Sequence, residues 1–337
     1  MATPRLENAF DPVTYTRIVE KAVMAKSALF NSTAIARSAE FDDLARSAGT
    51  SVIMPYIDEL DGTAEVGSRD ASIRGEVHAL AMGDVKAQKD YLSHSWGVSK
   101  LDAQLAGVEN VLRTDAERTA GFWVRNFDRL LLNKLTGVIE NNIANDGGDM
   151  VKDISKDTTG AAGATNKASA EAIIDTVLTM GDSFDELGLW VFPTQVYGTL
   201  LKLDAAMFVQ PSQLLPFRTY RGVPCVVTDG VAPKQGTNQK IFTSFALGAG
   251  SVLFGSANGL GGENVIVNDE HAAKNMGAKD LITRQNGLIM TIQGHTSKAP
   301  IVGANAGPEV DAYANASSWD RVYDRKFVRI AALRSNG

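Results

Sequence analysis

Residues 108–142 read VENVLRTDAERTAGFWVRNFDRLLLNKLTGVIENN and have the strongest periodicity in the chain. Apolar and small side chains recur there every three or four residues, on one face of a helix: Val108, Val111, Leu112, Ala116, Thr119, Trp123, Phe127, Leu130, Leu131, Leu135, Val138 and Ile139. The opposite face carries Arg113, Glu117, Arg118, Arg125 and Lys134. The pattern predicts one helix over about 108–144, roughly 50 Å long at 1.5 Å per residue. Sustained heptads are missing, which favours a helix lying across a sheet over a coiled coil.

The segment before this helix predicts two strands joined by a long polar loop. Residues 51–57, SVIMPYI, alternate, and Pro55 has no amide hydrogen for a ladder, so this strand is expected at a sheet edge. Residues 59–76 are rich in glycine and charge and too poor in apolar side chains to form a core. Residues 79–96 alternate again. A loop of this length without its own core usually carries an interaction.

The segments after the helix predict a compact α/β domain and a return to the first sheet. Helical spacing at 169–180 and 194–203 alternates with apolar strands at 187–192, 220–228 and 241–255. The strands at 287–294 and 327–333 have no helix nearby in the sequence, so we expect them to rejoin the sheet that 51–57 begins. Residues 1–45 show weak helical spacing and are expected to form an arm that packs on another subunit.

Composition indicates a folded protein that does not wrap nucleic acid. Hydrophobic residues make up 44% and charged residues 21% of the 337 residues, and the net charge is −6. A protein that wraps DNA normally shows a basic excess or patch. Basic residues are densest after Trp319, where a solvated face or a contact between subunits is expected. No apolar run is long enough for a membrane helix, and the N-terminus does not read as a secretory signal.

The search for catalytic or ligand-binding motifs yields no candidate site. The four histidines lack the spacing of a helical zinc site, and the single cysteine, Cys225, lies in an apolar strand that would not activate a thiol. Phosphate-binding and dinucleotide-binding glycine motifs are missing, as is a nucleophile elbow. The sequence therefore predicts no catalytic residue, no metal site and no cofactor.

Five segments, in this order, resemble one family of proteins. They are MPYIDELDGTAEV (54–66), HSWGVSKLDAQLAG (94–107), FWVRNFDRLLLNKLTGVI (122–139), DLITRQNGLIMTIQGHTSKAP (280–300) and SSWDRVYDRKFVRIAAL (317–333). Together they resemble the major capsid proteins of tailed double-stranded-DNA bacteriophages, over roughly residues 45–337. The resemblance implies the α+β Hong Kong 97-type capsid fold.

The resemblance also implies a division of the chain. It predicts an N-terminal arm (1–45), a peripheral domain (46–150 and 280–337) with an extended E-loop (about 59–78) and a spine helix (about 108–144), and an axial α/β domain (165–279). The E-loop would lie over a neighbouring subunit. Residues expected at subunit contacts are Asp61, Gly62, Glu65, Arg69, Arg74, Arg218, Arg221, Trp319, Arg321 and Arg325.

The implied function is that of a structural subunit and not of an enzyme. Pentamers and hexamers of the chain would close an icosahedral head shell around double-stranded DNA, without sequence-specific binding and without a membrane. Expected partners are the chain itself, a portal protein, and a scaffold or decoration protein. Assembly would take place in the host cytoplasm, and the product is the virion capsid. The alternatives are an encapsulin-like nanocompartment shell and a soluble α/β enzyme with its site in 165–275.

Overall fold

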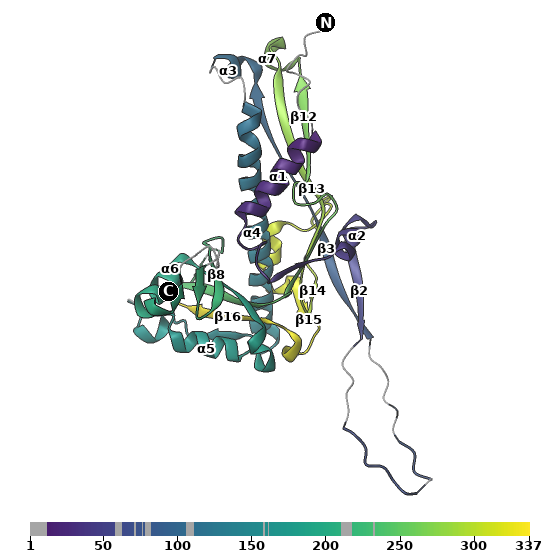
Figure 1. Cartoon of the computed structure of the whole chain (residues 1–337), viewed down its shortest axis with the longest axis vertical. Coiled ribbons are helices and arrows are strands. Elements are labelled where there is room, and N and C mark those ends of the chain that lie inside the picture. The colour runs from purple at the N-terminus through teal and green to yellow at the C-terminus, as the bar shows by residue number, and fades with distance from the viewer. Residues whose placement is uncertain are drawn as a thin grey trace.

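The structure is a computed structural model, and it shows a long arm, a compact lobe beside it and a projecting hairpin (Figure 1). It describes residues 12–57, 63–70, 72–75, 77, 82–105, 111–157, 159–160, 162–209, 218–231 and 233–337. The arm holds the longest helix and the longest strands, and the lobe holds a second sheet with its own helices. The chain is thus organised around one helix that both parts share.

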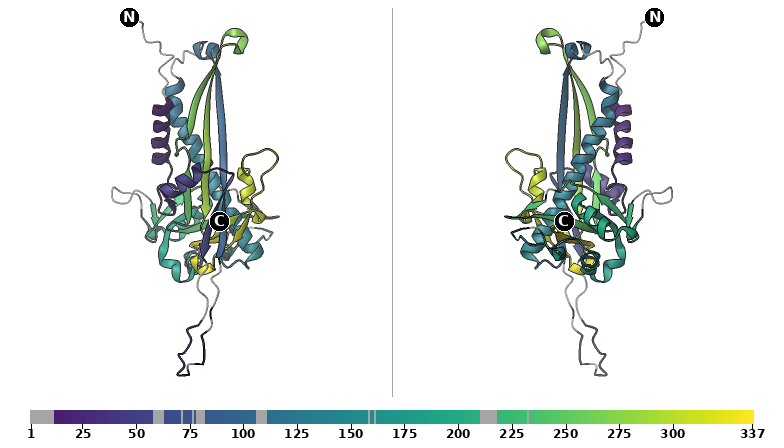
Figure 2. Two further views of the ribbon diagram at one scale, coloured as in Figure 1. Left: turned by 90° about the vertical axis from the view of Figure 1, so that its right-hand side faces the viewer. Right: turned by 90° about the vertical axis from the view of Figure 1, so that its left-hand side faces the viewer.

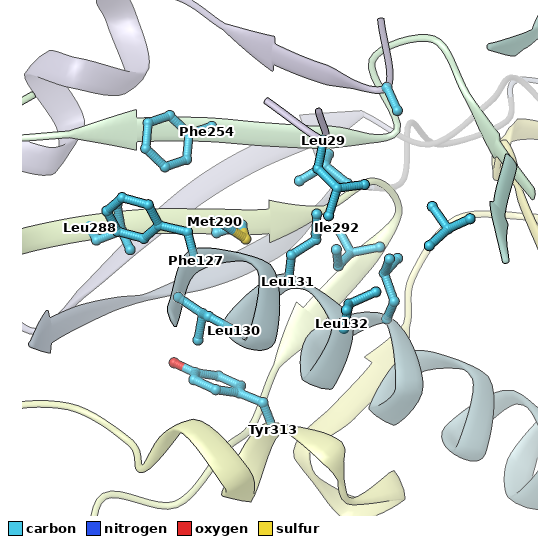
Figure 3. Close-up of a cluster of buried hydrophobic side chains, with 14 of the residues drawn as sticks. Leu29, Phe127, Leu130, Leu131, Leu132, Phe254, Leu288, Met290, Ile292 and Tyr313 are labelled. Atoms are coloured by element: carbon cyan, nitrogen blue, oxygen red, sulfur yellow. The ribbon is translucent and has the colours of Figure 1, made fainter. Parts of the chain in front are cut away.

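Helix α4 (Val111–Asn145) is the shared element, as the periodicity predicted. Its apolar face lies in the largest of the hydrophobic core clusters. There Phe127, Leu130 and Leu131 pack between the strands of the arm and the segment that carries Tyr313 (Figure 3). Trp123 is 1% exposed, and its indole Nε1 donates a hydrogen bond to Thr283 Oγ1 at 2.8 Å. Large buried side chains at helical spacing therefore fix α4 to the sheet.

The six-stranded sheet of the arm has the order β1-β11-β13-β3-β2, with β12 also paired to β13. Its strands are β1 (Ile35–Arg37), β11 (Val252–Ser256), β13 (Ala278–Ile292), β3 (Met82–Ser99), β2 (Ser51–Ile57) and β12 (Glu263–Asp269). Strand β2 lies at the edge of this sheet, which confirms the expectation from Pro55. Helices α1 (Pro12–Lys26) and α4 lie on one side of the long strands (Figure 2).

The eight-stranded sheet of the lobe has the order β4-β16-β10-β5-β8-β7-β6, with β9 paired to β10. Its strands are β4 (Val151–Asp153), β16 (Ile330–Ser335), β10 (Lys240–Gly248), β5 (Leu187–Phe192), β8 (Val223–Val227), β7 (Arg218–Tyr220), β6 (Phe208–Val209) and β9 (Lys234–Gln235). Alternation along β5 divides the core: Leu189 and Val191 join the cluster of α4. Trp190 and Phe192 join the cluster of α5 (Ala170–Leu178) and α6 (Thr194–Leu203). The sheet is therefore covered by helices on both faces.

Short elements complete the fold. Helix α2 (Ala39–Arg46) packs on β11 and β13, and a small two-stranded sheet pairs β14 (His295–Ser297) with β15 (Trp319–Arg321). The remaining helices are α3 (Lys100–Leu105), α7 (Ala272–Asn275), and the 3₁₀ helices η2 (Ala164–Asn166), η3 (Gly181–Glu186), η4 (Ala205–Met207), η5 (Val310–Ala314), η6 (Ala316–Ser318) and η7 (Arg325–Phe327).

The arrangement differs from the sequence expectations in three places. The range 165–279 is split, because β11 and β12 pair with β13 in the arm and not with the lobe. The last strand, β16, joins the lobe through β10 and β4 and does not return to the sheet of β2. The described part of 1–45 packs within its own chain: the Tyr15 hydroxyl lies 3.1 Å from Thr119 Oγ1. Each difference is a long-range pairing that no local pattern encodes.

Candidate inter-subunit surfaces

The described residues of the loop expected over about 59–78 lie beyond the hairpin of β2 and β3, away from both sheets (Figure 1). In its described residues, Val66 is 96%, Val77 97% and Ile73 64% exposed. Glu65, Arg69 and Arg74 are also exposed there. Asp61 and Gly62 lie outside the described residues. Three apolar side chains on one exposed segment gain nothing from folding of the isolated chain, so a second surface is their expected environment.

A turn at the far end of this loop is ordered by its own side chains. The Asp70 carboxylate accepts hydrogen bonds from the Ser72 amide at 2.9 Å and from the Ser72 hydroxyl at 2.7 Å. The Ile73 amide donates to the Asp70 carbonyl oxygen at 3.2 Å. These bonds to Ser72 hold the pKa of Asp70 below its usual value. Arg69 and Arg74 flank these local hydrogen bonds.

A buried lysine anchors the base of the same hairpin. Lys89 of β3 is 0% exposed, and its ammonium donates to the Ala45 carbonyl at 3.2 Å, to Ser47 Oγ at 3.0 Å and to the Ser47 carbonyl. Burial lowers the pKa of Lys89. The ammonium therefore ties the start of the projecting hairpin to the end of α2.

Arg218 and Arg221, both expected at subunit contacts, differ in how their guanidinium groups are held by their own chain. Arg221 adopts φ 51° and precedes Gly222 with φ 83°, in the tight turn that joins β7 to β8. Its guanidinium is 3.2 Å from the Asp204 carboxylate. Arg218 is exposed and lies over the Tyr197 ring at 5.8 Å. Arg218 is thus presented at the surface, whereas Arg221 is held by its own chain.

The three C-terminal candidates make contacts within their own chain. Trp319 is 3% exposed, and its indole Nε1 donates to the Tyr313 carbonyl at 2.8 Å. Arg321 binds both oxygens of Asp149, at 2.7 and 2.8 Å. Burial lowers the pKa of Arg325 to about 10, and its guanidinium donates to the carbonyls of Asp149 and Val328. These groups join the C-terminal segment to the end of α4 instead of facing outward.

Sequence reasoning missed a buried ion pair at the centre of the arm. Lys134, expected on the charged face of the helix, is 1% exposed, and its ammonium lies 2.7 Å from the Asp90 carboxylate and 3.0 Å from the Met290 carbonyl. The Tyr313 hydroxyl donates to Asp90 at 2.7 Å. Burial lowers the pKa of Lys134, and Asp90 opposes that shift. The four-residue spacing of Leu130, Lys134 and Val138 was the signal for this inward position.

Burial disfavours the charged forms of two side chains of types that serve in catalysis, Cys225 and His295. Burial raises the pKa of the Cys225 thiol to about 11 and lowers the pKa of His295 to about 4. Within the described residues, no group of three or more His, Cys, Asp or Glu side chains could hold a metal ion. None of the described helices has both the length and the apolar character to cross a membrane.

Comparisons with known proteins agree on one kind of protein. No protein-family model matches the chain. The major capsid protein of Bacillus phage SPP1 is 28% identical over 343 residues, covering 99% of this chain and 98% of that protein. The capsid of Ralstonia phage GP4 has a TM-score of 0.59 at 11% identity, covering 90% of this chain and 87% of that chain. The capsid of cyanophage Pam1 has a TM-score of 0.56 at 12% identity, covering 88% and 87%.

The sequence relative gives evidence on the kind of protein, and the solved structures give evidence on the fold. The similarity to the SPP1 protein extends over nearly the full length of both chains, and the two solved capsids share the overall fold over most of the chain. The encapsulin-like and enzyme alternatives find no support among them. The chain is therefore similar over its full length to a phage major capsid protein, and it has the α+β Hong Kong 97-type fold of the solved phage capsids.

Proposed function

We propose that this chain is the subunit of an icosahedral phage head, assembling as pentamers and hexamers around double-stranded DNA. The observation that carries the proposal is the full-length similarity to a phage major capsid protein. The SPP1 protein is itself named as a major capsid protein, and the solved relatives are described as phage capsids. A shell subunit needs many modest contacts repeated by symmetry and no catalytic centre.

The geometry supports assembly through the projecting loop. Val66, Ile73 and Val77 are exposed on a segment that extends away from both sheets, while Lys89 and α2 fix its base (Figure 1). A rigid base with an exposed apolar end suits a segment that docks on a neighbouring copy. Glu65, Arg69 and Arg74 would supply polar contacts beside these apolar residues, and Arg218 a contact between lobes.

The proposal includes partners and a location. The chain acts as a structural component and not as an enzyme, in the capsid of the virion, after assembly in the host cytoplasm. A portal protein and a scaffold or decoration protein are proposed partners besides further copies of the chain. The acidic net charge of −6 suits a container that encloses DNA without recognising its sequence.

Removing the loop tests the proposal. Deletion of residues 62–75 should leave a folded subunit, because the described part of this segment is exposed, but stable shells should not form. A triple substitution of Val66, Ile73 and Val77 by serine should give the same result, with stability changed by less than about 0.5 kcal/mol.

The matched control replaces exposed apolar residues elsewhere. Ile301 and Val302 are 41% and 57% exposed on a different loop, and their replacement by serine should leave shells intact. Circular dichroism would verify folding, and electron microscopy would score shells. Normal shells from the deletion variant would refute the assignment of the loop as an assembly element.

A further inference from the structure

The two helices that cover the long strands present basic side chains on their outer surface. Arg17 and Lys21 are exposed on α1, and Arg118, Arg125 and Arg129 are exposed on α4. Both helices lie on the same side of the long strands (Figure 2). We call these five residues the basic face. It contrasts with a chain whose net charge is −6.

Helical geometry places the three arginines of α4 in a row directed away from the sheet. They are separated by seven and four residues, spacings that return to the same side of a helix. Trp123 and Phe127, on the other side, are 1% and 0% exposed against the strands. From Arg118 to Arg129 the row extends about 16 Å along the axis.

Most of the basic face is not neutralised by the chain's own acids. Arg129 lies 2.8 Å from the Asp311 carboxylate. In the described ranges, no carboxylate oxygen lies within 4.0 Å of the charged nitrogens of Arg17, Lys21, Arg118 or Arg125. Elsewhere in the arm, Arg284 of β13 pairs with Glu263 of β12, and Lys100 at the start of α3 pairs with Glu270. Four cations without an ion pair therefore lie on the two helices of the arm.

We infer that the basic face contacts the phosphate backbone of the enclosed double-stranded DNA, an inference that rests on the proposed function. Arginine guanidinium groups bind phosphate oxygens through two parallel hydrogen bonds, and a row of them needs no base sequence. Four unpaired cations would neutralise up to four phosphates per copy, with a slope of log K against log salt of about −3.6. Such contacts are weak in one subunit and are repeated over the whole shell.

The alternative to DNA as the binding partner of the basic face is a protein. Ile18 and Met24 are 48% and 46% exposed on α1, and a scaffold helix could cover them. The density of unpaired cations favours the nucleic acid, because an apolar partner would have to desolvate those charges without compensation. The two occupants differ in what they require: phosphate binding depends on the charge, whereas helix docking depends on the apolar side chains.

The test measures DNA binding by the unassembled full-length chain, separated from shells by size exclusion. Fluorescence anisotropy of a labelled duplex of about 30 base pairs would be followed between about 25 and 200 mM NaCl. The double variant Arg118→Gln, Arg125→Gln should bind at least about fivefold more weakly, with a salt slope smaller by about 2. The Arg118→Lys, Arg125→Lys variant keeps both charges and should retain most of the affinity.

The matched control removes the same charge from the lobe. Arg218 and Lys240 are exposed there, and the variant Arg218→Gln, Lys240→Gln should bind within about twofold of the wild type. Equal losses in the two glutamine variants, or no binding by the wild type at the lowest salt, would overturn the inference. Loss of shells with unchanged DNA binding in the Arg118, Arg125 variant would instead assign the face to a protein partner.

Shell formation, scored separately by electron microscopy, keeps the two claims apart. The Arg118→Gln, Arg125→Gln variant should form shells of normal size, because both side chains are exposed and lie outside the projecting loop. Absence of shells from the wild type would count against the proposed function. Normal shells with unchanged DNA binding in the Arg118, Arg125 variant would overturn the inference alone.

Discussion

Gly137 in the middle of α4 allows the C-terminal segment to pack directly on the helix. A Cβ atom added at this position would overlap the Tyr313 carbonyl oxygen and would lie 2.6 Å from Trp319 Nε1. Trp319 and Tyr313 are both buried there and are joined by a hydrogen bond of 2.8 Å. Gly137→Ala therefore tests whether this close approach holds residues 313–319 against α4.

The expected change in the free energy of unfolding is the sum of opposing contributions. Alanine in place of glycine stabilises a helix interior by up to about 1 kcal/mol. Forcing a methyl group into a packed core costs about 1–3 kcal/mol, and disturbing the bond between Trp319 and Tyr313 costs about 0.5–1.5 kcal/mol more. We therefore expect Gly137→Ala to lower the free energy of unfolding by roughly 1–3 kcal/mol.

Gly121, on the same helix, is the matched control. A Cβ atom there would meet only Arg125 Nη1, at an ordinary 3.7 Å, so Gly121→Ala should raise stability by up to about 1 kcal/mol. Urea unfolding of the unassembled chain, followed by tryptophan fluorescence, would give both values. A Gly137→Ala chain as stable as the wild type would refute the close packing, whatever the result at Gly121.

Three further predictions concern buried ionisable groups, and urea or thermal unfolding across pH measures each. Lys134→Met leaves the Asp90 carboxylate buried without its cation and should cost about 3–5 kcal/mol, whereas Lys134→Met with Asp90→Leu should cost less; an equally unstable double variant would contradict the pairing. Burial lowers the pKa of His295 from 6.5 to about 4, so the folded chain excludes a proton that the unfolded chain binds. Stability should therefore fall as pH drops from 6.5 toward 4, and His295→Gln should flatten that slope. Burial raises the pKa of Asp128 from 3.8 to about 6, so stability that is present in acid is lost as pH rises through about 6. Asp128→Asn should add roughly 1–3 kcal/mol at about pH 8 and little at about pH 4; no gain at the higher pH would show that the carboxylate is solvated.

Local patterns were sufficient for the elements that have strong periodicity. The spine helix was expected over about 108–144 and is observed at Val111–Asn145, while residues 106–110 lie outside the described ranges. The strand at 187–192 and the helix at 194–203 have the expected bounds. In these segments apolar spacing and local propensity act in the same direction, so tertiary packing reinforces what the sequence favours.

Contacts between distant segments could not be read from the same patterns. Lys134 was expected to be solvated, because its burial depends on Asp90, 44 residues away in the sequence. Trp319 was expected at a subunit contact, because nothing nearby shows that it packs on α4 at Gly137. The strand β16 alternates as predicted, but its partners in the lobe are set by the path of the chain and not by its own residues.

The candidate surfaces, too, could be predicted from the sequence only in part. Polarity and glycine content predicted an extended loop, and its described residues are exposed, including Glu65, Arg69 and Arg74. The basic face escaped notice because its members come from two helices that are far apart in the sequence. Arg118 and Arg125 were assigned to the outer face of the long helix, but the neighbouring Arg17 and Lys21 become apparent only when α1 lies beside α4.

The central claim is that this chain builds a closed shell, and electron microscopy of the chain after size exclusion tests it most directly. The chain would be expressed alone and, in parallel, with a phage scaffold protein. The account predicts closed icosahedral shells or rings of five and six subunits in at least one of these preparations, and their loss when residues 62–75 are removed. A folded monomer in both preparations, without rings or shells, would contradict it.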